Sequence, residues 1–445
     1  MCAKQPHRQH PKPPSGNVRP IPTEGPQFGE PTPTPDPTKF SVKHGSDKAA
    51  YTILDSEKGT LKPRDFPVVH GAVEPSLTLA EALGDKGGGI IKQIESAEQI
   101  VFHAIGDTGN THGPKDESLV ADKMVADYDD PDPKSVPSFL YHLGDVVYSF
   151  GESAYYYDQF YDPYRDYPAP IFAIPGNHDG MVAPHSSTPT LKAFLENFCT
   201  LGEKPHRTPE AGELTRTAQI QPGVYFTLEA PFVRILGLYS NCLEDPGVIS
   251  DQGGTFPFLG QTQLNFLKAA LKRVDEEGFK GAVLVAVHHP PYVAQTQPGH
   301  IAGKHGGSPL MLEDIDAACA ETGVWPHAVL SGHAHNYQRF TRYYDGRETP
   351  FVISGNGGHA HSRLTRKGIP TIRVPVKQPT LSNGKDEVTF DSYDDQDFGY
   401  LRIIVNAKQL RIEYHPAPDG EDAKTPDDFV TVDLATRTLT HFQTR

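Results

Sequence analysis

The stretch that decides the fold is Leu143-Gly144-Asp145-Val146-Val147-Tyr148. It follows the apolar run 139–142, so we expect a buried strand that ends here and passes into a loop. The strand ends on the carboxylate of Asp145, and the hydroxyl of Tyr148 follows three residues later. Four other apolar runs also end on Asp, Asn or His: they lead into GDTGN at 106–110, GNHD at 176–179, HH at 288–289 and GHAH at 332–335.

The composition indicates a loop-rich globular protein with an acidic surface. The 445 residues include 42 prolines and 41 glycines, and 56 acidic against 41 basic residues give a formal net charge of −15. This charge disfavours contact with phosphate backbones, so nucleic acid is not expected as a bulk partner. A local positive site made by bound metal ions stays compatible with it. The four cysteines have no metal-ligand spacing and are too few for a disulfide framework, although one bridge stays open.

The sequence predicts neither a membrane span nor a leader. No run approaches the roughly 18 apolar residues of a membrane-spanning helix, so no membrane partner is expected. The N-terminus has no apolar stretch of the kind that signal peptides need, which favours a cytoplasmic protein. The sequence does not indicate the oligomeric state.

Three regions follow one another along the chain. Residues 1–40 are rich in proline and polar residues and are predicted to form a disordered arm. Residues 41–98 form an N-terminal extension, and residues 99–445 form the main domain. In that domain strands are expected at 99–105, 139–143, 171–174, 223–230, 232–239, 282–287 and 328–330, and helices at 116–128, 191–198, 261–277 and 309–322. Residues 360–398 are predicted to be a long loop, followed by added strands at 400–405, 410–414 and 430–432.

Strands that alternate with helices predict an α/β fold with a layered sheet. In open α/β sheets, binding sites form at the carboxyl ends of the strands. Each polar cluster lies just after an apolar run, so we expect the clusters to share one edge of the fold.

Each cluster alone has an ordinary explanation as a turn, a helix cap or a pair of loop histidines. Together they supply carboxylates, an amide and imidazoles, the ligand set that suits Fe, Mn or Zn. His333 and His335 are two positions apart, so in an extended segment both point to the same side. One segment can therefore reach two adjacent ions.

This ordered set of GD, GD, GNHD, VxxH and GHxH motifs resembles the calcineurin-like metallophosphoesterases over roughly residues 99–360. The resemblance implies a four-layer β-sandwich flanked by helices, with two metal ions at the strand ends. Most members have Asp-x-His in the first motif, whereas the third position here is Gly109. The GDxG motif followed by GDxxY is similar to the purple acid phosphatases, in which a tyrosinate binds a ferric ion. Tyr148 would then replace the missing histidine, although it could also be an aromatic wall residue.

The resemblance implies a ligand set for each ion. Fe(III) at site one would be bound by Asp107, Asp145, Tyr148 and His335. Fe(II), Zn or Mn at site two would be bound by Asp145, Asn177, His288 and His333. Asp145 would bridge the two ions.

Further histidines are candidates for contact with substrate. By the resemblance, His178 contacts the phosphate or protonates the leaving group, a role that suits the pKa of imidazole. Asp179 would either orient His178 or cap the loop. His305 is the first choice for a second substrate contact, with His300 as the runner-up. His289 is expected to support its loop, and His359 is an outside candidate.

The resemblance implies a metal-dependent phosphoric ester hydrolase. The leading expectation is an acid phosphatase that hydrolyses phosphomonoesters of small molecules or proteins by in-line attack of a metal-bound hydroxide. The alternatives are a phosphodiesterase or nucleotide hydrolase on the same scaffold, or a metal-binding interaction protein without turnover. A degenerate member would be expected to lose some ligands or His178, and this chain keeps them all.

Overall fold

The computed structural model describes residues 73–110, 113–182, 188–199, 221–243, 246–294, 305–364, 372–378, 387–421 and 424–441. The arm expected at residues 1–40 and most of the extension at 41–98 lie outside the described residues. None of the helices in the described ranges combines the length and the apolar character needed to cross a membrane.

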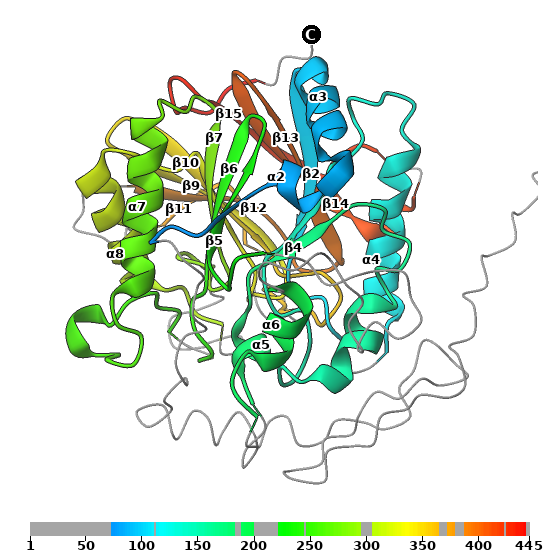
Figure 1. The fold of residues 1–445 in the computed structure, drawn as a ribbon, viewed down its shortest axis with the longest axis horizontal. Coiled ribbons are helices and arrows are strands. Elements are labelled where there is room, and N and C mark those ends of the chain that lie inside the picture. The colour runs from blue at the N-terminus through cyan, green and yellow to red at the C-terminus, as the bar shows by residue number, and fades with distance from the viewer. Residues whose placement is uncertain are drawn as a thin grey trace, which may run out of the picture.

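Among these residues, the strands form two mixed sheets that face each other (Figure 1). The six-stranded sheet has the order β15 (Asp428–Asp433), β14 (Gln409–Pro416), β13 (Gly399–Asn406), β2 (Gln99–Ile105), β3 (Leu140–His142), β4 (Ile171–Ala173). The nine-stranded sheet has the order β1 (Ser76–Thr78), β5 (Phe226–Ala230), β6 (Val233–Leu238), β7 (Ala282–Val287), β8 (Ala328–Ser331), β10 (Arg347–Ser354), β9 (Tyr337–Tyr344), β12 (Glu387–Asp394), β11 (Val376–Gln378). Strands β2, β3 and β4 run parallel to one another, as do β6, β7 and β8.

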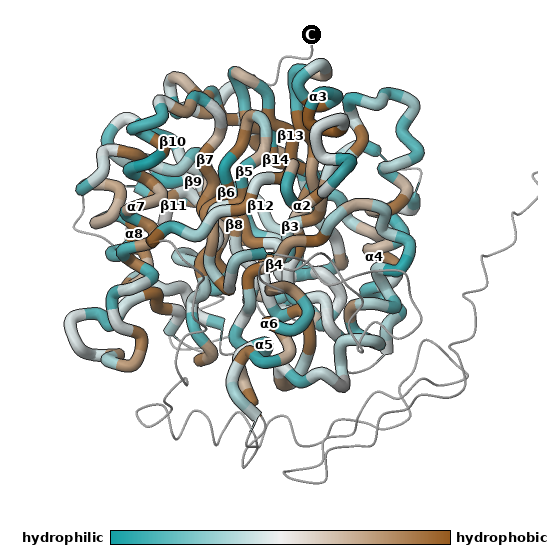
Figure 2. The backbone as a smooth tube through the Cα atoms, viewed as in Figure 1, coloured by the Kyte–Doolittle hydropathy of each residue, from teal (hydrophilic) through white to brown (hydrophobic). Residues whose placement is uncertain are grey.

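A core of apolar side chains fills the space between the two sheets. Alternate residues of β2, among them Phe102, meet alternate residues of β7 and β8, such as Leu284 and Leu330. This alternation follows from the two-residue period of strands, which sends successive side chains to opposite faces. Figure 2 shows hydrophobic colouring concentrated along the central strands and hydrophilic colouring on the outer loops and helices.

Helices cover the outer faces of both sheets and complete four layers. The α-helices are α2 (Leu79–Ala82), α3 (Gly87–Ala97), α4 (Lys115–Ala126), α5 (Asn177–Gly180), α6 (Lys192–Phe198), α7 (Thr262–Glu276) and α8 (Pro309–Thr322). Short 3₁₀ turns cover Gly84–Lys86, Asp127–Asp129, Ser153–Tyr155, Gln252–Gly254 and Ala417–Asp419, and a π-helix, η4, covers Tyr157–Tyr161. Val120 and Met124 of α4 pack in the apolar cluster on the outer face of the six-stranded sheet. Leu267 of α7 packs in the same cluster on the outer face of the nine-stranded sheet. The predicted α/β layered fold with flanking helices is confirmed.

Several parts of the fold differ from the sequence prediction or were not predicted. Residues 360–398 are not simply a loop, because β11 and β12 lie in this range and β12 pairs with β9. A register shift between Phe390 and Ser392 breaks the alternation of β12, which hides the strand in the sequence. Helix α3 begins with three glycines, which are poor helix formers, and its Ile94 is held by the core between the sheets. The β9–β10 hairpin was not predicted either.

Candidate metal and active site

The predicted residues meet where both sheets end. The positions are Asp107 after β2, Asp145 and Tyr148 after β3, Asn177 after β4, His288 after β7, and His333 and His335 after β8. All seven side chains are buried. The six-stranded sheet therefore contributes the oxygen donors, and the nine-stranded sheet contributes the imidazoles.

Three of these residues have an unusual backbone. Asp107, Asp145 and His333 have φ angles of 58°, 57° and 68°, in the left-handed region that non-glycine residues seldom adopt. Such a conformation costs free energy, and it is found where the surrounding structure holds a functional group in place. These turns bring ligand atoms of Asp107 and Asp145 within 4.8 Å of each other and the His333 N–H onto Oδ2 of Asp107 at 2.7 Å.

The side chains fall into two groups, and the first is built around Asp107. Its Oδ1 atom accepts a hydrogen bond from the Tyr148 hydroxyl at 2.9 Å and lies 3.5 Å from Nε2 of His335. The Tyr148 hydroxyl is 3.3 Å from the same Nε2. Three donor atoms from three strand ends thus surround one point.

The second group is built around Asn177. Its Oδ1 atom lies 3.0 Å from Nε2 of His288 and 3.1 Å from Nδ1 of His333. His288 Nδ1 is 2.9 Å from the carbonyl oxygen of Leu143, which orients the ring so that Nε2 faces the site. This arrangement is common for imidazoles that bind metals.

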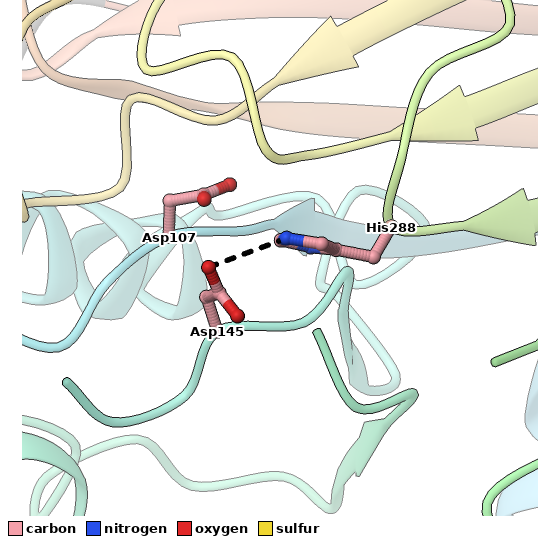
Figure 3. A group of neighbouring side chains, drawn as sticks. All are labelled: Asp107, Asp145 and His288. Carbon is pink, nitrogen blue, oxygen red and sulfur yellow. Dashed lines mark ion pairs between the residues drawn. The ribbon is translucent and has the colours of Figure 1, made fainter. Parts of the chain in front are cut away.

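Asp145 lies close to one member of each group, and Figure 3 shows its carboxylate near Asp107 and paired with His288. Its Oδ2 atom is 3.3 Å from His288 Nε2, and ligand atoms of Asp107, Asp145 and His288 all lie within 4.8 Å of one another. Oδ1 accepts a hydrogen bond from the backbone N–H of His178 at 2.8 Å, whereas Oδ2 is buried and faces the imidazoles of His288 and His178 without a hydrogen bond. A buried carboxylate oxygen that lacks a hydrogen bond and faces imidazoles fits a position that a cation completes.

The charges at this point favour a cation as well. Burial raises the pKa of Asp107 to about 6. Burial would lower the pKa of His288, but the charges of Asp145 and Asp107 outweigh it and raise that pKa to about 9. The carboxylates therefore attract positive charge, and the residues present fit metal binding. Ligation by the individual residues stays a prediction.

The loop that carries Tyr148 fills the space beside Gly109. A Cβ atom at position 109 would lie 2.7 Å from the carbonyl oxygen of Val146 and 2.8 Å from Cα of Val147, so no side chain fits there. Tyr148 instead places its hydroxyl beside Asp107. Burial and the charges of Asp107 and Asp145 raise the pKa of Tyr148 well above its ordinary value. A tyrosinate here would therefore require a strongly charged cation.

His178 and Asp179 have separate partners. His178 Nδ1 is 2.8 Å from the carbonyl oxygen of Ser149, so Nδ1–H donates there and Nε2 faces Asp145, 3.9 Å from Oδ2. The Asp179 carboxylate accepts hydrogen bonds from the backbone N–H groups of Val146 and Gly176 at 2.8 to 3.2 Å. Of the two roles considered for Asp179, the structure shows the loop cap.

The other histidines named as candidates lie in the same region, except His300, which lies outside the described residues. His305 Nδ1 is 3.4 Å from Nε2 of His333. His289 contacts the Ser240 hydroxyl through Nδ1 at 2.7 Å, which agrees with a role in supporting its loop. His359 stacks on the Tyr148 ring with centroids 3.5 Å apart and planes 7° apart.

Two buried residues of the site were missed by the sequence analysis. His142 Nδ1 accepts from the N–H of Gly144 at 3.2 Å, and its Nε2 lies 3.0 Å from the Thr108 hydroxyl, so His142 links the loops after β2 and β3. A histidine inside an apolar strand, two residues before GD, could have signalled this role. Gln159 hydrogen bonds to the Tyr148 backbone, and the sequence contains no signal for that contact.

A family model described as calcineurin-like phosphoesterase matches residues 100–337. The chain belongs to this family. Calcineurin-like phosphoesterases generally use two metal ions, and the Asp107, Asp145 and His288 cluster is a possible ligand set for metal. The family match supports phosphoester hydrolysis as the general activity.

Individual relatives of this calcineurin-like phosphoesterase are distant. A protein named "Probable inactive purple acid phosphatase 9" from Arabidopsis thaliana is 21% identical over 309 residues, which are 64% of this chain and 42% of the relative. The purple acid phosphatase PPD1 from yellow lupin (Lupinus luteus) seeds is 16% identical, with a TM-score of 0.48 over 75% of this chain and 54% of the lupin chain. GAP50, described as the anchor in the inner membrane complex of Plasmodium, is 14% identical, with a TM-score of 0.46 over 74% of this chain and 87% of GAP50. The chain thus spans less than half the length of the curated plant relative.

Proposed function

We propose that this calcineurin-like phosphoesterase is a purple acid phosphatase-like hydrolase of phosphomonoesters. The observation that carries the proposal is the Tyr148 hydroxyl, 2.9 Å from Asp107 and 3.3 Å from His335, beside a glycine that leaves no room for a side chain. A phenol in this position favours a trivalent ion, because burial opposes its ionisation and a ferric ion would offset that cost.

Two sites follow from the two groups of side chains. Fe(III) would be held by Asp107, Tyr148 and His335, and Fe(II), Zn or Mn by Asn177, His288 and His333, with Asp145 shared. A metal pair would lower the pKa of a bound water and neutralise charge on the phosphoryl oxygens. The protein's own contribution is to position the phosphate and to exclude water through a buried, pre-organised site.

His178 and His305 are the proposed contacts with substrate. His178 keeps its proton at Nδ1 on the Ser149 carbonyl, so Nε2 is the atom that would exchange a proton with the leaving oxygen. His305 lies beside His333 and would contact the phosphate. The substrate would be a phosphorylated small molecule or phosphoprotein. A phosphodiesterase on the same scaffold is the alternative.

The plant relative's name includes the word inactive, so turnover has to be tested directly. The test combines metal analysis of purified protein with hydrolysis of p-nitrophenyl phosphate and of bis(p-nitrophenyl) phosphate. We expect paired metal ions and faster hydrolysis of the monoester, with activity lost on chelation. Preference for the diester would favour the phosphodiesterase, and bound metal without turnover of either ester would contradict the proposal.

Replacing Tyr148 with phenylalanine tests the ferric site. Oxidised wild-type protein is expected to be violet from tyrosinate-to-iron charge transfer, and Tyr148→Phe is expected to be colourless because the phenolate oxygen is absent. Absorption spectra with iron analysis on both proteins provide the measurement. A colourless, iron-free and fully active wild-type protein would rule out the ferric assignment while leaving a phosphoesterase.

A further inference from the structure

We infer that Gln159 is a positioning residue that holds Tyr148 in reach of the metal, and that Gly109 makes this possible. The inference rests on the proposed function, because it concerns how the proposed tyrosine ligand is placed. Gln159 lies eleven residues after Tyr148 on the π-helix η4, and its side chain is fully buried.

One side-chain amide pairs with both backbone groups of Tyr148. The backbone N–H of Tyr148 donates to Oε1 of Gln159 at 2.8 Å, and Nε2 of Gln159 donates to the Tyr148 carbonyl oxygen at 2.8 Å. Two bonds from one planar group fix both the position and the direction of the residue they hold. The amide therefore determines where the Tyr148 Cα atom lies.

The helix that carries Gln159 is itself firmly anchored. The ring of its neighbour Phe160 packs against Phe198, Tyr161 and Tyr164, with centroids 5.0 to 5.7 Å apart. Phe160 and Tyr161 also belong to the buried apolar cluster beneath the six-stranded sheet. Gln159 thus connects the Tyr148 loop to a rigid aromatic layer.

Other contacts hold the Tyr148 ring and the two residues that precede Tyr148. The Tyr148 ring lies between His359, 3.5 Å away, and His178, 4.1 Å away by ring centroids, which sets its tilt. The Asp179 carboxylate holds the N–H groups of Val146 and Val147. Among the described residues, Gln159 is the one whose side chain hydrogen bonds to both backbone groups of Tyr148 itself.

Gly109 leaves room for the same amide. An ideal Cβ atom at position 109 would lie 2.5 Å from Oε1 of Gln159, well inside van der Waals contact. The backbone of Val146 and Val147, at 2.7 and 2.8 Å, excludes the same Cβ atom. Gly109 therefore leaves room both for the Gln159 amide and for the loop that leads to Tyr148.

The same amide pairing elsewhere in the chain provides a control. Gln263 of α7 accepts from the Tyr239 N–H at 2.6 Å and donates to the Tyr239 carbonyl oxygen at 2.8 Å. Gln263 is also buried, and Tyr239 is not among the predicted ligands. Replacement of either glutamine by methionine keeps the volume and removes two hydrogen bonds, so a purely structural loss should be alike in both variants.

The test follows the melting temperature of metal-free protein during titration with Fe(III), the ion proposed for the site that contains Tyr148. Bound metal raises the melting temperature, and the concentration needed reports the affinity. Gln159→Met is expected to need about 10- to 100-fold more Fe(III) than wild type, the usual effect of removing the support of a metal ligand. Gln263→Met should melt at a lower temperature without metal but respond to the wild-type concentration of Fe(III).

A double variant distinguishes an effect of Gln159 that acts through Tyr148 from a general loss of protein stability. If Gln159 acts through Tyr148, adding Gln159→Met to Tyr148→Phe should leave the Fe(III) response of Tyr148→Phe unchanged. A wild-type response in Gln159→Met, or an equal effect of Gln159→Met in both backgrounds, would overturn the inference alone. A wild-type protein with no response to Mn(II), Zn(II) or iron would instead overturn the proposed function and the inference with it. If Gln159→Met does not fold, Gln159→Glu, which keeps the size and the acceptor for the Tyr148 N–H, takes its place in the cycle.

Discussion

Replacing Asp145 with alanine is expected to abolish metal binding and phosphoester hydrolysis together. Asp145 is the carboxylate close to one member of each group of donor atoms, and its Oδ2 atom has no hydrogen-bond partner. Loss of a shared ligand should remove about 4 kcal/mol or more of transition-state stabilisation, which corresponds to a fall of about 10³-fold in kcat/KM. Metal content per chain and kcat/KM on p-nitrophenyl phosphate are the measurements.

A second substitution at the same position separates ligation from the packing of the loop. Asp145→Asn keeps an oxygen that can accept from the His178 N–H, a bond of 2.8 Å in the native protein, but it lacks the negative charge. We expect Asp145→Asn to retain the native circular dichroism spectrum. Its metal content should be nearly as low as that of Asp145→Ala. Full turnover in either variant would exclude Asp145 as the bridging ligand.

Replacing His178 with alanine is expected to lower kcat by about 10²- to 10⁴-fold while the metal content stays that of wild type. His178 Nε2 faces Asp145, and its Nδ1 is occupied by the Ser149 carbonyl oxygen, so the imidazole is oriented without being among the predicted ligands. The effect should be larger for alkyl phosphates than for p-nitrophenyl phosphate, because a poor leaving group depends more on protonation.

The dependence on leaving group distinguishes the two roles considered for His178. Equal losses for both kinds of ester would indicate contact with the phosphate rather than protonation of the leaving oxygen. His305→Ala serves as the comparison, since His305 lies beside His333 and is expected to affect KM more than kcat. Loss of metal in His178→Ala would show that His178 has been wrongly assigned.

The site residues could be predicted from sequence because their signals are local. Each donor follows an apolar run, as His288 follows the six apolar residues of β7, and strand ends gather at the edge of a sheet. The division into two groups came from the family resemblance. The structure places Asp107 beside Tyr148 and Asn177 beside His288, as that division requires.

The features that escaped prediction depend on contacts between distant segments. Gln159 has the same chemical character as any polar residue on a helix until its amide is seen on the Tyr148 backbone. Helix α3 begins at Gly87 with a glycine run that argues against a helix, and the sandwich core overrides this local preference. Strand β12 is concealed by the break in its alternation after Phe390.

The division of the donors between two sheets has a consequence for the order of events during synthesis. Strand β2, which leads to Asp107, pairs with β13 at residues 399–406, so the six-stranded sheet is incomplete until residue 406 has been made. Contacts between such distant segments form late, because closing long loops is slow. A nascent chain should therefore acquire its cations only after its last strands have docked, and metal uptake would mark the completion of folding.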